Sequence, residues 1–219
     1  WGKCDQCLQC VDHCLFQSLN RCGRSMTVRE VVDEVLQDRL FYKNSSGGIT
    51  VSGGEPLLQS RFVGRLLEVC KKEGLHTALE TTGHASWDHF EAALPFCDLI
   101  LYDIKQLDTH SHKRTTGAGN EAVLENFRKV ARTHPVWVRI PLIAGFNDSD
   151  NHTRKIISLC REIGAQKISL LPYHEGGQSK CEQLGKIYGF PDGKRPSERR
   201  IAKLKQMIEK AGFTAAVGS

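Results

Sequence analysis

Short aliphatic and β-branched runs alternate along the chain with longer segments whose apolar residues recur at helical spacing. Ile49, Thr50 and Val51 make one such run between two glycine pairs, which predicts a short buried strand. Strands that alternate with helices indicate a parallel α/β sheet. The pattern predicts strands at 49–54, 76–82, 99–105, 136–143 and 167–174, allows a short last strand at 213–217, and predicts helices at 27–40, 56–72, 86–94, 121–134, 150–163 and 197–211.

The two helices that flank the 49–54 strand have recognisable end signals. Thr27 and Glu30 have the spacing of a capping box, in which two side chains satisfy backbone groups at the start of a helix. Pro56 suits a first helical turn, where its missing N–H would have no partner in any case. Gly74 follows the second helix and suits a left-handed cap. These signals indicate where the two helices begin and where the second one ends.

Each predicted strand has polar residues at or just beyond its C-terminal end. In a parallel β/α barrel these ends share one face, and that face holds the active site. Singly, each residue has a structural explanation, such as an ion pair between Asp103 and Lys105 or a hydrogen-bonded core histidine at His174. Five successive strands with this feature favour a ligand cleft, and mixed charges beside bare glycine amides suit a zwitterionic ligand with a ribose and a purine. The residues are Gly53, Gly54, Glu55, Glu80, Thr81, Asp103, Lys105, Arg139 and His174.

The chain has nine cysteines, and four of them cluster between positions 4 and 14. Clustering at short spacing points to metal ligands rather than to a disulfide framework. Cys4, Cys7, Cys10 and Cys14 form C-x2-C-x2-C-x3-C, the spacing of bacterial ferredoxins, which predicts iron–sulfur ligands. Two features differ from those ferredoxins, because Leu15 stands where they have proline and no second set of four follows. A structural zinc site is the alternative, and it ranks lower because zinc ligands usually form two separated pairs.

Composition excludes several classes of protein. Hydrophobic residues make up 40% and charged residues 25% of the 219 positions, with a formal net charge of +5, as in an ordinary globular protein. We find no apolar run of membrane length and no secretory signal, so we expect a soluble cytoplasmic protein without a membrane or nucleic-acid partner. The basic stretch 194–210 is interrupted by glutamates and indicates a solvated helix face. The chain starts at Trp1 rather than Met, and we expect a fragment of a longer protein.

Five motifs, taken in this order, resemble the radical S-adenosylmethionine activating enzymes of glycyl radical enzymes. Pyruvate formate-lyase-activating enzyme is the familiar member, and the branch with a ferredoxin-like insert is most similar. The resemblance implies an α/β fold, a partial (β/α)6 barrel lacking its first strand, with residues 1–24 as the remnant of the insert and residues 25–219 as the barrel. The motifs are Gly-Gly-Ile-Thr-Val-Ser-Gly-Gly-Glu-Pro-Leu-Leu-Gln at 47–59, Glu-Thr-Thr-Gly at 80–83, Leu-Tyr-Asp-Ile-Lys at 101–105, Arg-Ile-Pro-Leu-Ile-Ala-Gly-Phe-Asn at 139–147 and Leu-Leu-Pro-Tyr-His at 170–174.

The resemblance also implies roles for the polar residues at the strand ends. Gly53, Gly54 and Glu55 match a segment that holds the amino group of the methionine moiety of S-adenosylmethionine. Glu80 and Thr81 match a pair, commonly Asp-Thr, near the carboxylate of that moiety and an associated monovalent cation. Further cofactor contacts are implied for Asp103, Ile104, Lys105, Arg139 and His174, and an auxiliary [4Fe-4S] cluster for Cys4, Cys7, Cys10 and Cys14.

One motif of the family is missing from the sequence, the C-x3-C-x2-C loop that holds the cluster at the active site. Cys10 and Cys14 have the first spacing, but Gln17 stands where the third cysteine would be. The resemblance places that loop upstream of Trp1, so we expect this chain alone to be inactive.

The activity that the resemblance implies for the intact protein is reductive cleavage of S-adenosylmethionine to a 5′-deoxyadenosyl radical. That radical would remove a hydrogen from a glycine of a partner glycyl radical enzyme. A flavodoxin- or ferredoxin-type protein would donate the electron. The alternatives are an iron–sulfur electron-transfer protein that binds no S-adenosylmethionine, and a radical enzyme that acts on a small molecule or a peptide.

Overall fold

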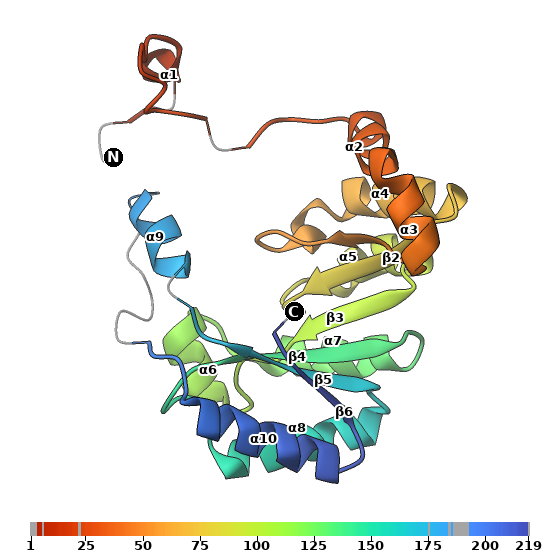
Figure 1. The fold of residues 1–219 in the computed structure, drawn as a ribbon, viewed down its shortest axis with the longest axis vertical. Helices are drawn as coiled ribbons and strands as arrows, with labels where there is room; N and C mark the ends of the chain where they lie inside the picture. The colour runs from red at the N-terminus through yellow and green to blue at the C-terminus, as the bar shows by residue number, and fades with distance from the viewer. Residues whose placement is uncertain are drawn as a thin grey trace.

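The computed structural model describes residues 4–5, 7–21, 23–174, 176–183, 185 and 193–218. Their strands form one parallel sheet in the order β1-β2-β3-β4-β5-β6, so each strand pairs with the next one along the chain. This is the parallel α/β sheet that the alternating pattern predicts, and the short last strand is formed (Figure 1). The strands are β1 (Gly48–Val51), β2 (His76–Thr81), β3 (Leu99–Asp103), β4 (Val136–Leu142), β5 (Lys167–Pro172) and β6 (Thr214–Val217).

Helices connect the strands and pack against the sheet and against one another. Figure 1 shows α7, α8 and α10 together along one side of the sheet, whereas α2, α3, α4 and α5 gather near β2. Contacts join α4 to α5, and α10 to both α8 and β6. The helices are α1 (Gln9–Asp12), α2 (Val28–Val35), η1 (Leu36–Asp38), α3 (Arg39–Ser45), η2 (Pro56–Gln59), α4 (Ser60–Lys72), α5 (Trp87–Ala93), η3 (Leu94–Phe96), α6 (Thr109–Thr116), α7 (Glu121–Ala131), α8 (Asp150–Ile163), α9 (Gly176–Gln183) and α10 (Glu198–Lys210).

The two faces of the sheet differ in burial, and β4 displays this most clearly. Its residues alternate strictly between buried and half-buried positions. Val138 and Ile140 are almost fully buried in the core, whereas Trp137 and Arg139 are half-buried on the other face. Successive side chains of a strand point to opposite faces, so one face of the sheet is covered by helices and the other remains accessible.

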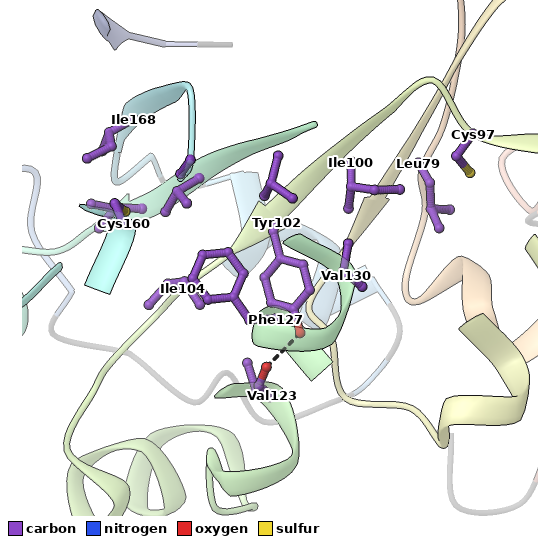
Figure 2. Close-up of a cluster of buried hydrophobic side chains, with 14 of the residues drawn as sticks. Leu79, Cys97, Ile100, Tyr102, Ile104, Val123, Phe127, Val130, Cys160 and Ile168 are labelled. Atoms are coloured by element: carbon purple, nitrogen blue, oxygen red, sulfur yellow. Dashed lines mark hydrogen bonds between the residues drawn. The ribbon is translucent and has the colours of Figure 1, made fainter. Parts of the chain in front are cut away.

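Tyr102 of β3 lies at the centre of the core between the sheet and α7. Its ring packs against Phe127 with 4.8 Å between the ring centroids. Its hydroxyl donates a 2.7 Å hydrogen bond to the carbonyl oxygen of Val123, which satisfies the polar end of a fully buried side chain (Figure 2). This contact fixes α7 against β3, the strand that ends at Asp103.

The predicted end signals are confirmed. Thr27 Oγ1 accepts a hydrogen bond from Glu30 N at 3.3 Å, and Glu30 Oε2 accepts one from Thr27 N at 2.6 Å, which completes the capping box of α2. Pro56 opens the 3-10 helix η2, which leads directly into α4. Gly74 follows α4 with a φ of +79°, as a left-handed cap requires.

Some elements differ from the prediction. The strand predicted at 49–54 ends at Val51, because residues 52–55 turn into η2. Helices α1, α6 and α9 were not predicted. The sequence of α6, Thr-His-Ser-His-Lys-Arg-Thr-Thr, has no apolar stripe, so its helical form depends on its ends. Asp108 Oδ1 accepts a 2.8 Å hydrogen bond from Ser111 N at the start, and Gly117 has a φ of +86° at the end.

The N-terminal segment that contains α1 stands apart from the sheet in Figure 1. It contains the four clustered cysteines and the short helix α1. Over the whole of the described chain, no helix combines the length and the apolar character that crossing a lipid bilayer requires.

Candidate functional site

The turn between β1 and η2 exposes bare backbone. Gly53 has a φ of +141°, a conformation that residues with a side chain rarely adopt. A Cβ atom added at Gly53 or Gly54 would meet no atom of the described structure within 4 Å. The main chain of this turn therefore borders open space, as the sequence predicts for a segment that approaches a ligand.

The Glu55 carboxylate ties this turn to the end of β2. Its Oε1 accepts hydrogen bonds from Thr81 Oγ1 at 2.8 Å and Leu57 N at 3.3 Å. Its Oε2 accepts hydrogen bonds from Thr82 Oγ1 at 2.6 Å and Thr82 N at 2.9 Å. Four donors occupy the four acceptor positions that a carboxylate offers, so the side chain of Glu55 acts as a structural link.

Charged side chains from three neighbouring strands meet on the accessible face of the sheet. Arg139 of β4 stands opposite Asp103 of β3 in the strand register. Arg139 Nη1 lies 2.5 Å from Glu80 Oε2 of β2, and Arg139 Nε lies 3.4 Å from Asp103 Oδ1. Lys105 Nζ lies 3.4 Å from Asp103 Oδ2. We call Glu80, Asp103, Lys105 and Arg139 the charge row; it contains two acids and two bases.

Two polar atoms of the charge row are buried and unsatisfied. Asp103 Oδ1 and Arg139 Nε have no hydrogen-bond partner among the residues that the structure describes. Burial raises the pKa of the Asp103 carboxyl above its usual value, and the cationic Lys105 and Arg139 side chains offset only part of this effect. Buried polar groups are normally paired, so these two atoms mark a position where a ligand group would satisfy both.

A cavity of about 210 Å³ opens beside the charge row. Asp103 and Lys105 form part of its wall, with Thr82 and His84 from the end of β2 and His112 from α6. A larger hollow of about 680 Å³ lies at the other ends of the strands, beside Gly47 and His76. The smaller cavity is the better candidate, because Asp103 and Lys105 of the charge row border it.

The remaining predicted residues lie at the same end of the sheet but differ in their surroundings. Thr81 is buried on the face opposite Glu80 and binds Glu55. Ile104 is 1% exposed and its N–H donates to Arg139 O at 2.9 Å, so only its main chain is near the charge row. His174 is exposed two residues beyond β5, and its Nδ1 accepts a 3.2 Å hydrogen bond from Gly176 N. The structure does not bring the His174 ring into the charge row.

Residues that the sequence did not single out hold the loop after β2. Asn126 of α7 donates from Nδ2 to the carbonyl oxygens of Gly83 and Ala85, at 3.0 and 2.9 Å. Gly83 has a φ of +76°, and a Cβ there would lie only 1.8 Å from the Tyr102 hydroxyl. Together with Thr82, these residues fix the strand end that contains Glu80. The sequence signal for Thr82 was the second threonine of Glu-Thr-Thr-Gly; nothing local marked Asn126.

The four clustered cysteines are accessible but not gathered. Cys4, Cys7 and Cys10 are exposed and Cys14 is half-exposed. Hydrogen bonding with Ser18, whose Oγ lies 3.2 Å from the sulfur, lowers the pKa of the Cys14 thiol. No group of three or more His, Cys, Asp or Glu side chains in the described ranges is arranged to hold a metal ion.

Comparison with protein families identifies the fold. The model of the radical SAM superfamily matches residues 7–157, which is more than half of the chain. A solved domain of pyruvate-formate lyase-activating enzyme from Bacteroides vulgatus is 30% identical, with a TM-score of 0.66 over 79% of this chain and 99% of that domain. Streptococcus suis SuiB, in a structure bound to S-adenosylmethionine, is 14% identical with a TM-score of 0.65 over 91% of this chain and 45% of that protein, which shows a shared fold alone.

Several curated relatives are named as activating enzymes. The isethionate sulfite-lyase activating enzyme of Nitratidesulfovibrio vulgaris is 45% identical over 83% of this chain and 60% of its own length. The trans-4-hydroxy-L-proline dehydratase activating enzyme of Clostridioides difficile is 36% identical over 90% of this chain and 66% of its own length. The 4-hydroxyphenylacetate decarboxylase activating enzyme of Clostridioides difficile is 36% identical over 100% of this chain and 70% of its own length.

The chain thus spans 60% to 70% of the length of these relatives. The parallel sheet and the turn at Gly53 lie within a chain that matches the radical SAM family model. The protein belongs to the radical SAM superfamily, in the group of glycyl radical enzyme activating enzymes.

Proposed function

We propose that the full-length protein activates a partner glycyl radical enzyme. One-electron cleavage of S-adenosylmethionine gives methionine and a 5′-deoxyadenosyl radical, which takes a hydrogen atom from a glycine and leaves a glycyl radical on the partner. Relatives named for the enzymes that they activate support this assignment. The observation that carries the proposal is the position of two buried atoms without a hydrogen bond, Asp103 Oδ1 and Arg139 Nε, at the same end of the sheet as the bare backbone of Gly53 and Gly54.

S-adenosylmethionine fits this site by its chemistry. The molecule has an ammonium group, a carboxylate and a sulfonium, so it needs both acids and bases around it. In the described structure a carboxylate oxygen of Asp103 and an N–H of Arg139 make no hydrogen bond, although the two groups form an ion pair. The main chain of Gly53 and Gly54 faces open space, which permits close approach. The bound cofactors supply the radical chemistry, and the residues of this chain bind, orient and shield them.

The structure refines the role that we propose for Glu55. All four acceptor positions of its carboxylate are occupied by Leu57, Thr81 and Thr82. We therefore assign the ligand contact of the 53–55 segment to main-chain atoms. We assign the Glu55 side chain, with Thr81, to holding that segment against β2. His174 remains a proposed contact that requires a change of its side-chain position.

The cluster-binding residues also remain proposals. The four thiolates of Cys4, Cys7, Cys10 and Cys14 are soft ligands of the type that iron–sulfur clusters require, and they are accessible on one short segment. We assign them to an auxiliary [4Fe-4S] cluster. We assign the electron donor to the flavodoxin or ferredoxin type and the protein to the cytoplasm, where thiolates stay reduced.

The test uses the full-length protein, reconstituted anaerobically with iron and sulfide. It is reduced, mixed with S-adenosylmethionine and a candidate partner, and examined by electron paramagnetic resonance. Isethionate sulfite-lyase and 4-hydroxyphenylacetate decarboxylase are the first candidates, since relatives of this chain are named for them. We expect a glycyl doublet whose splitting changes when the glycine is deuterated.

Two other results would each favour a different function. A silent spectrum for every candidate partner, with normal formation of 5′-deoxyadenosine, would point to a small-molecule or peptide substrate. An intact cluster with no binding of S-adenosylmethionine in a calorimetric titration would point to an electron-transfer protein. Either result would reject the activating function.

A further inference from the structure

A buried amide continues the contact between β3 and β4 beyond their paired residues. In the strand register the pairing runs from Ile100 with Val136 to Asp103 with Arg139. Asn147 lies in the segment after β4, is 1% exposed, and reaches back between the two strands. The pairing thus ends at the charge row, and Asn147 bridges the chain just beyond it.

Every hydrogen-bonding group of the Asn147 side chain is used. Its Nδ2 donates to Lys105 O at 2.8 Å and to Pro141 O at 2.7 Å. Its Oδ1 accepts from Ile143 N at 2.8 Å. The two carbonyl oxygens belong to different strand ends, so one amide nitrogen joins the segment after β3 to the end of β4.

The chemistry of this bridge is specific to an amide. Two carbonyl oxygens repel each other and need a group with two N–H donors between them, whereas Ile143 N needs an acceptor on the same side chain. Aspartate has the same shape but offers no donor when ionised, and an aliphatic residue offers neither. A fully satisfied buried network of this kind fixes one geometry, and a partly satisfied one is costly.

Two further buried amides support the same segment. Gln106 Nε2 donates to Phe146 O at 3.2 Å, next to Asn147 in the chain. Asn120 Nδ2 donates to Gln106 O at 2.9 Å, and its Oδ1 accepts from Thr109 Oγ1 at 2.6 Å. The backbone carbonyls at positions 105 and 106 are therefore both held by side-chain amides.

The two residues that Asn147 joins, Lys105 and Pro141, lie close in the chain to Asp103 and Arg139 of the charge row. Lys105 and Pro141 each lie two residues beyond the paired Asp103 and Arg139, Lys105 just after the end of β3 and Pro141 within β4. The Asp103 and Arg139 side chains form an ion pair at 3.4 Å but no hydrogen bond, so the backbone that positions them also contributes to their separation. Beyond that ion pair, the Asn147 side chain joins the backbone two residues further along each segment, at Lys105 and at Pro141.

We propose that Asn147 is a positioning residue for S-adenosylmethionine, which holds Asp103 and Lys105 at the correct distance from Arg139. This inference rests on the proposed function, because it assumes that the charge row binds the cofactor. Asn147 acts through the backbone at positions 105 and 141 and does not itself touch the ligand.

The experiment compares Asn147→Ala and Asn147→Asp with a matched control in the cluster-loaded full-length protein. Thr77→Val is the control, because Thr77 is fully buried and its Oγ1 donates to Phe96 O at 2.6 Å at the opposite end of the sheet. Affinity for S-adenosylmethionine is measured by calorimetry well below the melting temperature of each variant. Amide hydrogen exchange at Ile104 and Ile143 is measured in the same variants without cofactor.

We expect both Asn147 variants to raise the dissociation constant for S-adenosylmethionine by about tenfold or more. This is the change that the loss of one or two hydrogen bonds typically produces. Exchange at Ile104 and Ile143 should accelerate. Thr77→Val should lower the melting temperature while its dissociation constant changes by less than about twofold. If Asn147→Asp does not fold, Asn147→Ser, which keeps one donor, gives the same comparison.

The outcomes separate this inference from the function on which it rests. Wild-type affinity in a folded Asn147→Ala variant would overturn the positioning role alone. An equal loss of affinity in Thr77→Val would also overturn it, because general destabilisation would then explain the effect. A wild-type protein with an intact cluster and no affinity for S-adenosylmethionine would overturn the proposed function, and this inference with it.

Discussion

Asp103 and Arg139 stand opposite each other on β3 and β4, yet Asp103 Oδ1 and Arg139 Nε lie 3.4 Å apart without a hydrogen bond. Arg139 is instead bound to Glu80 through Nη1 at 2.5 Å. An ion pair without a hydrogen bond leaves one acceptor on Asp103 and one donor on Arg139 available to a ligand.

Replacing Asp103 by asparagine should weaken the binding of S-adenosylmethionine. The substitution removes the negative charge beside Arg139 and keeps the shape, so we expect a loss of about tenfold or more, with unchanged iron content. Asp98→Asn is the control. Asp98 lies outside the charge row, and its Oδ1 is 2.7 Å from Lys71 Nζ. Calorimetry and iron analysis check both variants. A loss of iron in Asp103→Asn would contradict the assignment of Asp103 to binding S-adenosylmethionine.

Gly83→Ala should destabilise the protein far more than Gly74→Ala. Both glycines have a positive φ, +76° and +79°, so both substitutions introduce backbone strain of about 1 kcal/mol. At Gly83 the new Cβ would collide with a buried side chain, 1.8 Å from the Tyr102 hydroxyl, whereas a Cβ added at Gly74 would meet no other part of the described structure within 4 Å. We expect a further loss of about 2 kcal/mol at Gly83 in urea unfolding. Equal losses would contradict the packing of Tyr102 against this loop.

The stability of the protein should decrease on acidification because of His152. Burial lowers the pKa of His152 from 6.5 to about 4, with a smaller contribution from Lys155. Between these two values His152 is protonated in the unfolded chain but neutral in the folded chain. The free energy of unfolding therefore decreases by about 3 kcal/mol as pH falls from 6.5 to 4. His152→Leu should reduce the pH dependence of the free energy of unfolding by about this amount, and His76→Gln at an exposed position is the matched control. An unchanged slope in His152→Leu would refute the assignment.

Alkylation should divide the cysteines into two classes. In the metal-free protein Cys4, Cys7 and Cys10 are exposed and should react with iodoacetamide, as should Cys14. Burial raises the pKa of the Cys97 and Cys160 thiols to about 12, so these two should stay unmodified until the protein unfolds. Reconstitution with iron and sulfide should protect the four clustered thiols. Mass spectrometry that found them still reactive at full iron content would exclude the auxiliary cluster.

The sequence predicted the sheet well, because its strands are short β-branched or aliphatic runs between turn residues, such as Ile49 to Val51. It also predicted that Glu80, Asp103 and Arg139 would lie together, since parallel strands align their C-terminal ends. The helix α6 was missed, because its residues have no apolar period and its start depends on the Asp108 cap.

Side-chain contacts between distant segments could not be predicted from the sequence. The Glu55 carboxylate is occupied by Thr81 and Thr82, and no local pattern reveals which donors a side chain meets 26 or 27 residues away. The bridge from Asn147 to Lys105 spans 42 residues for the same reason. The exposed position of His174 depends on where β5 ends, which is Pro172 rather than His174.

The central claim is that the ends of β1 to β4 bind one molecule of S-adenosylmethionine. Hydrogen–deuterium exchange of the full-length, cluster-loaded protein with and without the cofactor tests it most directly. We predict that peptides covering 52–57, 79–84, 102–107 and 138–142 become protected together, at one cofactor concentration. Protection confined to other segments, or to only one of these four, would contradict the claim.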